Sequence, residues 1–268
     1  MCRSEEEGGR RCTDHRRLQS KSLDDLRPDP APGRPDVDWA HDPANAPEYL
    51  YETYPTYVAG IVVDMMATAK QQESQMTSDV LDALPSDARM HGLEFRMKSP
   101  GSLARKLNDR CEKSPMRDPE HIADAITDVV RYTAISDPDR VVATARTMAD
   151  GLTARGWTIT EVEHSYLDCN QYKGLHLLAR HSSGCVAEFQ FHTEASQNVK
   201  DATHVDYEAV RDPRLPLTER AALVEKMTAV WAQVPTPAGV TELTELGGCK
   251  VAPKRYAPPK TNRGRDAQ

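Results

Sequence analysis

A nine-residue stretch carries an acid, an amide and an imidazole on one side of a predicted strand. In CVAEFQFHT, residues 185–193, alternate positions point in opposite directions, so Glu188, Gln190 and His192 share one face. The other face, which includes Phe189, is apolar enough to pack on a core. A carboxylate in a partly buried strand costs free energy unless it is paired or binds a metal, so this face is a candidate for catalysis. An amphipathic edge strand facing water would have the same pattern.

Basic residues gather around a Ser-Pro-Gly-Ser turn in FRMKSPGSLARK. The four cations are Arg96, Lys98, Arg105 and Lys106. The turn precedes a predicted helix that begins near Ser102, and backbone N–H groups at a helix N-terminus favour anions. Four cations beside such an end suit a polyphosphate, although a solvated basic face has the same composition.

A third candidate lies in ITDVVRYT, where Asp128 enters a predicted strand and Arg131 follows three residues later. A carboxylate at a strand edge can hold Mg²⁺, and a nearby guanidinium can hold a phosphate or a base. A surface salt bridge is the alternative for this pair.

Taken in order, these segments resemble the synthetase domain of RelA/SpoT-type alarmone synthetases. The family's R-x-K-S-x-x-S-x-x-x-K element is similar to RMKSPGSLARK, its N-G-Y-x-S-L-H element to NQYKGLH, and its E-I-Q-I-R-T strand to EFQFHT. The resemblance covers roughly residues 55–212. It implies an α/β (α+β) fold of nucleotidyltransferase-like type, with a mixed, largely antiparallel sheet flanked by helices. It also implies transfer of the β,γ-pyrophosphate of ATP to the ribose 3′-OH of a purine nucleotide.

The resemblance implies a role for each matching residue. The residues expected to bind ATP are Arg96, Lys98, Ser102, Lys106 and Arg131. Asp128 and Glu188 are expected to be catalytic and to hold Mg²⁺, with Glu188 also a candidate base on the attacking 3′-OH. The residues expected on the acceptor side are Tyr172, stacking on the purine, with Lys173, His176, Gln190 and His192.

The chain departs from the family pattern on the acceptor side. His192 stands where the family usually has Arg, and LDC replaces the Pro-Lys pair before the Tyr172 element. The family strand has its Arg five residues after the Asp, whereas Arg131 follows Asp128 by three. The acceptor therefore stays open between GDP or GTP and AMP or ADP. Two alternatives also stay open: a toxin that pyrophosphorylates the 3′ end of tRNA, and an inert nucleotide-binding protein.

The elements that must position these residues are predicted from hydrophobic periodicity. Helices are expected over 54–84, from 102, over 119–126, over 136–156 and near 196–210 and 218–233. Strands are expected at 92–98, 129–135 and 157–167, with a hairpin over 174–193. The sequence predicts a single α/β synthetase domain over 46–235, between a disordered arm over 1–45 and a flexible basic tail over 236–268.

Charge and composition limit the partners. The net charge is −7, from 41 acids against 34 bases, which argues against a nucleic-acid coat or an anionic membrane surface as the main partner. No apolar run approaches the ~20 residues that span a bilayer, so we expect a soluble cytoplasmic protein. The expected partners are ATP with a purine nucleotide or the tRNA 3′ end, an antitoxin protein, and further copies of the chain.

The cysteines carry little information about function. None of the 6 forms a C-x-x-C pair, so a disulfide framework is not expected. Cys2, Cys12 and His15 offer three metal ligands at a spacing that matches no zinc motif, and reduced thiols on an exposed arm are the simpler interpretation.

Overall fold

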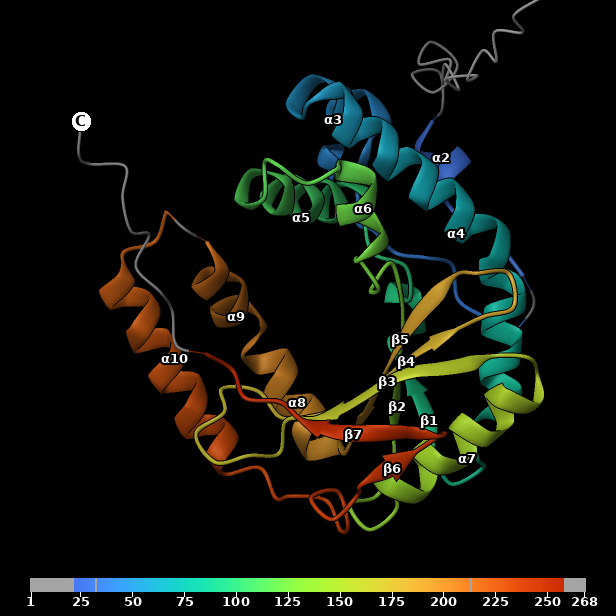
Figure 1. Cartoon of the computed structure of the whole chain (residues 1–268), viewed down its shortest axis with the longest axis vertical. Helices are drawn as coiled ribbons and strands as arrows, with labels where there is room; N and C mark the ends of the chain where they lie inside the picture. The colour runs from blue at the N-terminus through green and yellow to red at the C-terminus, as the bar shows by residue number, and fades with distance from the viewer. Residues whose placement is uncertain (1–21, 32, 213, 258–268) are drawn as a thin grey trace, which may run out of the picture. The chain divides into compact units, whose positions relative to one another are not determined.

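The computed structural model describes residues 22–31, 33–212 and 214–257 (Figure 1). The possible metal ligands Cys2, Cys12 and His15 lie outside these residues. Where the sequence predicts one domain, the described residues form two compact units. Unit 1 comprises residues 22–27, 39–68 and 99–126, and unit 2 comprises residues 28–38, 69–98 and 127–257. Each unit is described by itself.

Unit 1 is helical. It holds α2 (Leu23–Leu26), η1 (Pro43–Asn45), α3 (Pro47–Thr53), the first part of α4 (Thr56–Ala83), α5 (Pro100–Lys113) and α6 (Pro119–Asp124). Part of the segment predicted as a disordered arm is therefore ordered, with Leu26 and Trp39 buried. The physical reason is that these apolar side chains are buried, which a polar segment rich in proline does not suggest.

The start of α5 explains the Ser-Pro-Gly-Ser turn. Ser99 caps the helix and Pro100 occupies its first turn, where the missing N–H costs nothing. A Cβ on Gly101 would lie 2.7 Å from the carbonyl oxygen of Ala44, so glycine permits close packing of α5 on η1.

Unit 2 is built on a seven-stranded sheet in the order β1-β2-β5-β4-β3-β7-β6 (Figure 1). The strands are β1 (Arg89–His91), β2 (Val130–Ile135), β3 (Thr158–His164), β4 (Leu175–Arg180), β5 (Val186–His192), β6 (Glu245–Leu246) and β7 (Cys249–Pro253). The pairs β2–β5 and β3–β7 are parallel, and the remaining four are antiparallel. The predicted mixed, largely antiparallel sheet flanked by helices is confirmed.

β5 lies inside the sheet, between β2 and β4, so it is not an edge strand. Its apolar face packs on the core of unit 2: the ring of Phe189 stacks on Tyr132 at 5.4 Å and meets Trp157 edge-on at 5.8 Å. Tyr132 Oη lies 2.9 Å from Thr77 of α4, so α4 covers this face. The helix α7 (Val141–Ala154) contacts the end of α4 and lies on the same side of the sheet (Figure 1).

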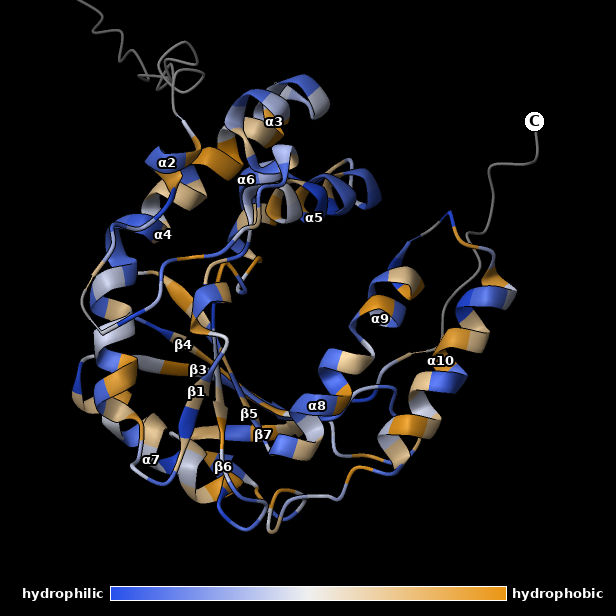
Figure 2. Cartoon of the chain, turned by 180° about the vertical axis from the view of Figure 1, so that it is seen from behind, coloured by the Kyte–Doolittle hydropathy of each residue, from blue (hydrophilic) through white to orange (hydrophobic). Residues whose placement is uncertain are grey.

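Three helices follow β5: α8 (Glu194–Ala202), α9 (His204–Arg211) and α10 (Leu217–Ala232). α9 and α10 pack through a small apolar cluster of Val210, Met227, Trp231 and Val234. In Figure 2 α10 carries both hydrophobic and hydrophilic residues, as expected for a helix that buries one side. Within the described part of the chain, no helix is both long and apolar enough to cross a bilayer.

Three further segments differ from their predicted structure. The helix predicted near 196–210 is two helices, α8 and α9, which meet at Thr203. The strand predicted over 92–98 is replaced by β1 and a turn of 3-10 helix, η2 (Leu93–Phe95), because Gly92 adopts a φ of 62° and redirects the chain. Residues 245–253 were expected in a flexible tail, but they form β6 and β7, and β7 extends the sheet beside β3.

Candidate active site

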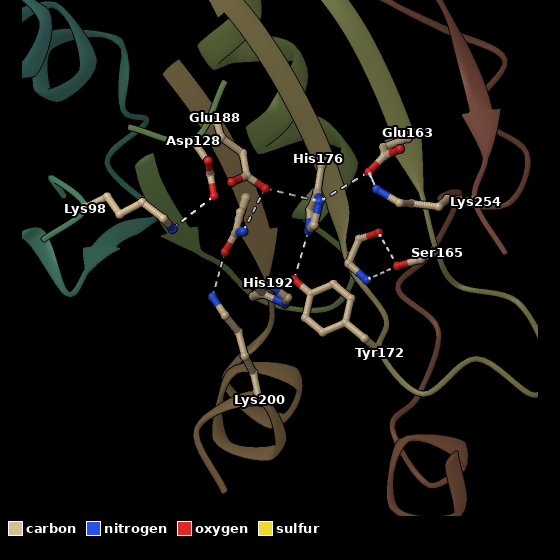
Figure 3. Close-up of polar contacts among 12 residues, drawn as sticks. Lys98, Asp128, Glu163, Ser165, Tyr172, His176, Glu188, His192, Lys200 and Lys254 are labelled. Atoms are coloured by element: carbon tan, nitrogen blue, oxygen red, sulfur yellow. Dashed lines mark hydrogen bonds and ion pairs between the residues drawn. The ribbon is translucent and has the colours of Figure 1, made fainter. Parts of the chain in front are cut away.

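The polar face of β5 is covered rather than exposed to water. Gln190 and His192 are buried, with 5 % and 0 % of their surface exposed. Glu188, two residues before Gln190 on the same strand, is half-buried. Gln190 Nε2 donates to Glu188 Oε1 at 2.9 Å, and His176 Nδ1 of β4 lies 3.5 Å from the same oxygen. Four of the residues predicted for catalysis and acceptor binding therefore lie together (Figure 3).

The hydroxyl of Tyr172 connects two histidines. Tyr172 Oη lies 2.8 Å from His176 Nε2 and 2.9 Å from His192 Nε2, and the Nδ1 of His192 lies 3.0 Å from Ser196 Oγ. A single hydroxyl proton can serve only one imidazole, so the other imidazole must donate to the tyrosine oxygen. A Cβ on Gly174 would lie 2.7 Å from His176 Nε2, so glycine leaves room for this network.

The ring of Tyr172 belongs to an aromatic cluster. Trp231 and Tyr256 approach it edge-on, with centroids at 5.1 Å and 6.0 Å. Burial raises the pKa of Tyr172 well above its usual value, so the phenol stays protonated. Stacking of this ring on an acceptor purine stays a prediction, and the contacts in hand show it packed against protein rings.

The burial of His192 predicts a pH-dependent stability. Burial, with the nearby Lys200, holds the pKa of His192 well below its usual range, so the folded protein keeps this ring neutral. The unfolded chain takes up the proton as pH falls below about 6.5, so the free energy of unfolding should drop by about 1 kcal/mol between pH 7.5 and 5.5. Urea unfolding of wild type and His192→Gln at both pH values measures the difference. Equal pH dependence in the two proteins would contradict this account.

A second carboxylate, Glu163 on β3, approaches the same ring nitrogen of His176 as Glu188 does. Its Oε1 lies 3.6 Å from His176 Nδ1 and also accepts a hydrogen bond from Lys254 Nζ. Lys254 follows β7, and its carbonyl oxygen accepts from Asn170 Nδ2 at 2.8 Å. The C-terminal segment is therefore held against the loop that carries Tyr172 (Figure 3).

Asp128 lies just before β2 and pairs with Lys98, with Nζ 3.1 Å from Oδ2. Among the described residues, no group of three His, Cys, Asp or Glu side chains is arranged to hold a metal ion. One carboxylate on β5 and one just before the neighbouring strand β2 nevertheless suit Mg²⁺, which commonly takes one or two carboxylates and completes its shell with phosphate oxygens and water. Asp128 and Glu188 are the pair that could serve in this way.

Arg96 has a different environment from the one expected of a phosphate-binding residue. Its side chain is 2 % exposed, and its Nε donates to Glu73 Oε1 at 2.5 Å. Its Nη1 donates to the carbonyl oxygens of Pro35 and Leu93 at 2.7 Å and 2.8 Å. Because the guanidinium is buried and hydrogen-bonded within the protein, we interpret Arg96 as a structural residue and leave it out of the ATP site.

The remaining predicted residues divide between the two units. Ser102 and Lys106 lie on α5 in unit 1, and Lys98 lies in unit 2. The first N–H groups of α5 are already engaged, since Gly101 N donates to Asn45 Oδ1 at 3.1 Å and Ser102 N to Ser99 Oγ at 3.4 Å. In unit 2, Lys173 is 7 % exposed, and Arg131 is the register partner of Glu188.

Sequence reasoning did not single out Glu163, Lys200 and Lys254, which line the same network. Lys200 of α8 donates from Nζ to Gln190 Oε1 at 2.6 Å. Its sequence signal would have been its spacing along α8, since Ser196 and Lys200 are four residues apart on one helix face and Ser196 contacts His192. The signal for Lys254 was weaker, because the segment around it was predicted as a flexible tail.

Comparisons with known proteins give partial structural likenesses. No family model and no curated protein matches the chain. Among solved structures, small alarmone synthetase 1 from Bacillus subtilis is similar over 61 % of this chain and 85 % of its own, at 12 % identity and a TM-score of 0.38. A Type VI effector in complex with its immunity protein is similar over 66 % of this chain and 93 % of its own, at 20 % identity and a TM-score of 0.35. Small alarmone synthetase 2 from Bacillus subtilis is similar over 65 % of this chain and 96 % of its own, at 16 % identity and a TM-score of 0.34.

Proposed function

We propose that the chain is a pyrophosphokinase that transfers the β,γ-pyrophosphate of ATP to the ribose 3′-OH of a purine nucleotide. The observation that carries the proposal is the covered polar face of β5. There Glu188 contacts the imidazole of His176 and the side-chain amide of Gln190, on strands inside the sheet. The motif resemblance to RelA/SpoT-type synthetases supports the same reaction, with GDP or GTP and AMP or ADP as the acceptors.

In this reaction the 3′-oxygen forms a bond to the β-phosphorus of ATP. The bond between that phosphorus and the α,β-bridging oxygen breaks, and AMP leaves with the electron pair. Glu188 takes the proton of the 3′-OH, and Lys98 lies where it can bind phosphate oxygens beside Asp128. Mg²⁺ held by Asp128 and Glu188 would neutralise phosphate charge when bound. Positioning and charge neutralisation supply most of the catalysis in such transfers.

His176 and Tyr172 are proposed to orient the acceptor side. His176 bridges the two carboxylates Glu163 and Glu188, and Tyr172 fixes the ring from its other nitrogen. The imidazole ring therefore has a fixed orientation beside Glu188, the candidate base. A fixed ring beside the base is proposed to hold the acceptor 3′-OH where Glu188 can take its proton. The antitoxin partner and the oligomeric state stay predictions.

Transfer of label from γ-³²P-ATP tests the function. Purified protein and Mg²⁺ are incubated with GDP, GTP, AMP, ADP or deacylated tRNA in separate reactions, and products are resolved by chromatography. Label on a nucleotide is the expected result and names the acceptor. Label on tRNA would show that the acceptor is the tRNA 3′ end and not a free nucleotide. Label that stays on ATP in every reaction would contradict the proposal and favour an inert nucleotide-binding protein.

A further inference from the structure

Lys200 differs from the other lysines of the network in its partner. Lys98 pairs with Asp128, and Lys254 pairs with Glu163. Lys200 instead donates to the neutral amide oxygen of Gln190, and within the described part of the chain no carboxylate oxygen lies within ion-pair distance of its Nζ. Figure 3 shows Lys200 extending from its helix toward Glu188 of β5 and Asp128, which lies just before β2.

Arg131 brings a second cation to the same face of the sheet. In the parallel pairing of β2 and β5, Arg131 is opposite Glu188, so both lie on the face away from Tyr132 and Phe189. Among the residues that the structure describes, no carboxylate forms an ion pair with its guanidinium. Burial and then the charge of Arg131 lower the pKa of Lys200 to about 8, as expected for two nearby cations.

Neither half-buried cation forms an ion pair with a described carboxylate, and the nearby charges of Glu188 and Asp201 offset only part of the free energy that this costs. An anion bound by both cations would remove the remainder. We propose that Arg131 and Lys200 together bind the pyrophosphate group that is transferred, a role in which Lys200 is a catalytic residue. This inference depends on the proposed function for its substrate. The amide of Gln190 holds the Lys200 amine close to Glu188, so the phosphate would be bound beside the candidate base.

Lys200→Met and Lys200→Arg test the proposal, with Lys250→Met, an exposed lysine of β7, as the matched control. Loss of a charged donor to the reacting group should lower the rate of transfer by about 100-fold in Lys200→Met. Binding of inorganic pyrophosphate, measured by calorimetry with Mg²⁺, should weaken by about 10-fold or more, as expected for the loss of a charge-assisted hydrogen bond. Lys200→Arg, which keeps the charge, should retain most of both properties.

Thermal unfolding separates this role from a structural one. Lys200→Met removes a buried charge but leaves the buried Gln190 Oε1 without its donor, so these effects should nearly cancel and the melting temperature should stay within about 2–4 °C of the wild type while activity falls. A structural lysine would give a melting temperature lower by more than this, with pyrophosphate binding unchanged once the protein is folded, and that result would overturn the proposal.

The pH profile provides an independent readout. The charged groups that face Lys200 are Arg131 on β2, Glu188 on β5 and Asp201 on α8, and Asp201 Oδ2 lies 3.6 Å from His91 Nε2 on β1. Transfer should fall as pH rises through about 8, where the amine loses its proton. In Lys200→Arg this loss should move to higher pH.

The outcomes separate the two proposals. Wild-type protein that transfers no label counts against the proposed function, whereas pyrophosphate binding that depends on Lys200 still supports the phosphate site. Wild-type transfer that is unchanged in Lys200→Met, together with unchanged pyrophosphate binding, overturns the phosphate site and leaves the proposed function standing.

Discussion

Glu188→Gln should reduce pyrophosphate transfer by about 10³-fold, the size expected when a general base is lost. The amide has nearly the same shape and can still contact Gln190 and His176, so the network should stay assembled. It cannot accept the 3′-OH proton or supply negative charge. ATP should therefore still bind, which calorimetry with a non-hydrolysable analogue measures.

The matched control for this variant is Glu161→Gln. Glu161 is a glutamate of the same sheet, on β3, but its side chain is exposed. Activity of this control should equal that of the wild type. Full activity in Glu188→Gln would remove Glu188 as the base, and loss of ATP binding together with activity would point to a role in holding the nucleotide instead.

Arg96→Ala should destabilise unit 2 by about 3–5 kcal/mol, the cost of removing one partner from a buried ion pair. Glu73 would lose the guanidinium that donates to its Oε1 at 2.5 Å. Arg34 would remain 2.8 Å from Oε2, but this ion pair lacks the alignment of a hydrogen bond. Two backbone carbonyls would lose their donor as well. Urea unfolding measures the change in the free energy of unfolding.

The same variant distinguishes the structural role of Arg96 from the ATP-binding role that the motif predicts. A phosphate-binding arginine would weaken ATP binding in Arg96→Ala and leave the stability within about 0.5 kcal/mol of the wild type, as surface substitutions usually do. Arg146→Ala, at an exposed arginine of α7, is the control and should leave both properties unchanged.

The buried pair of Arg96 and Glu73 also affects the site indirectly. Arg131 N donates to the carbonyl oxygen of Arg96 at 2.8 Å, and Lys98 N donates to that of Val129 at 2.9 Å. The backbone around Arg96 therefore fixes the strand that carries Arg131 and the position of Lys98. In the proposed function, Arg96 therefore acts through the backbone that positions Arg131 and Lys98, without contacting a phosphate itself.

The sequence by itself determined which residue types share a face and where most elements begin. Alternation along residues 185–193 correctly grouped Glu188, Gln190 and His192, because the two-residue period of a strand is a local property of the chain. The long helix α4, the strand β2 and the hairpin of β4 and β5 also follow from local patterns of apolar residues and turns.

Only the tertiary structure decided which distant side chains meet. Arg96 is buried against a glutamate 23 residues earlier, and Lys254 reaches a glutamate 91 residues earlier. No local pattern encodes such pairs, because they depend on strand order and on which helix covers which face of the sheet. The same reason makes β5 an inner strand with both faces covered, so that its polar side chains form a buried network with Lys200 instead of a solvated surface.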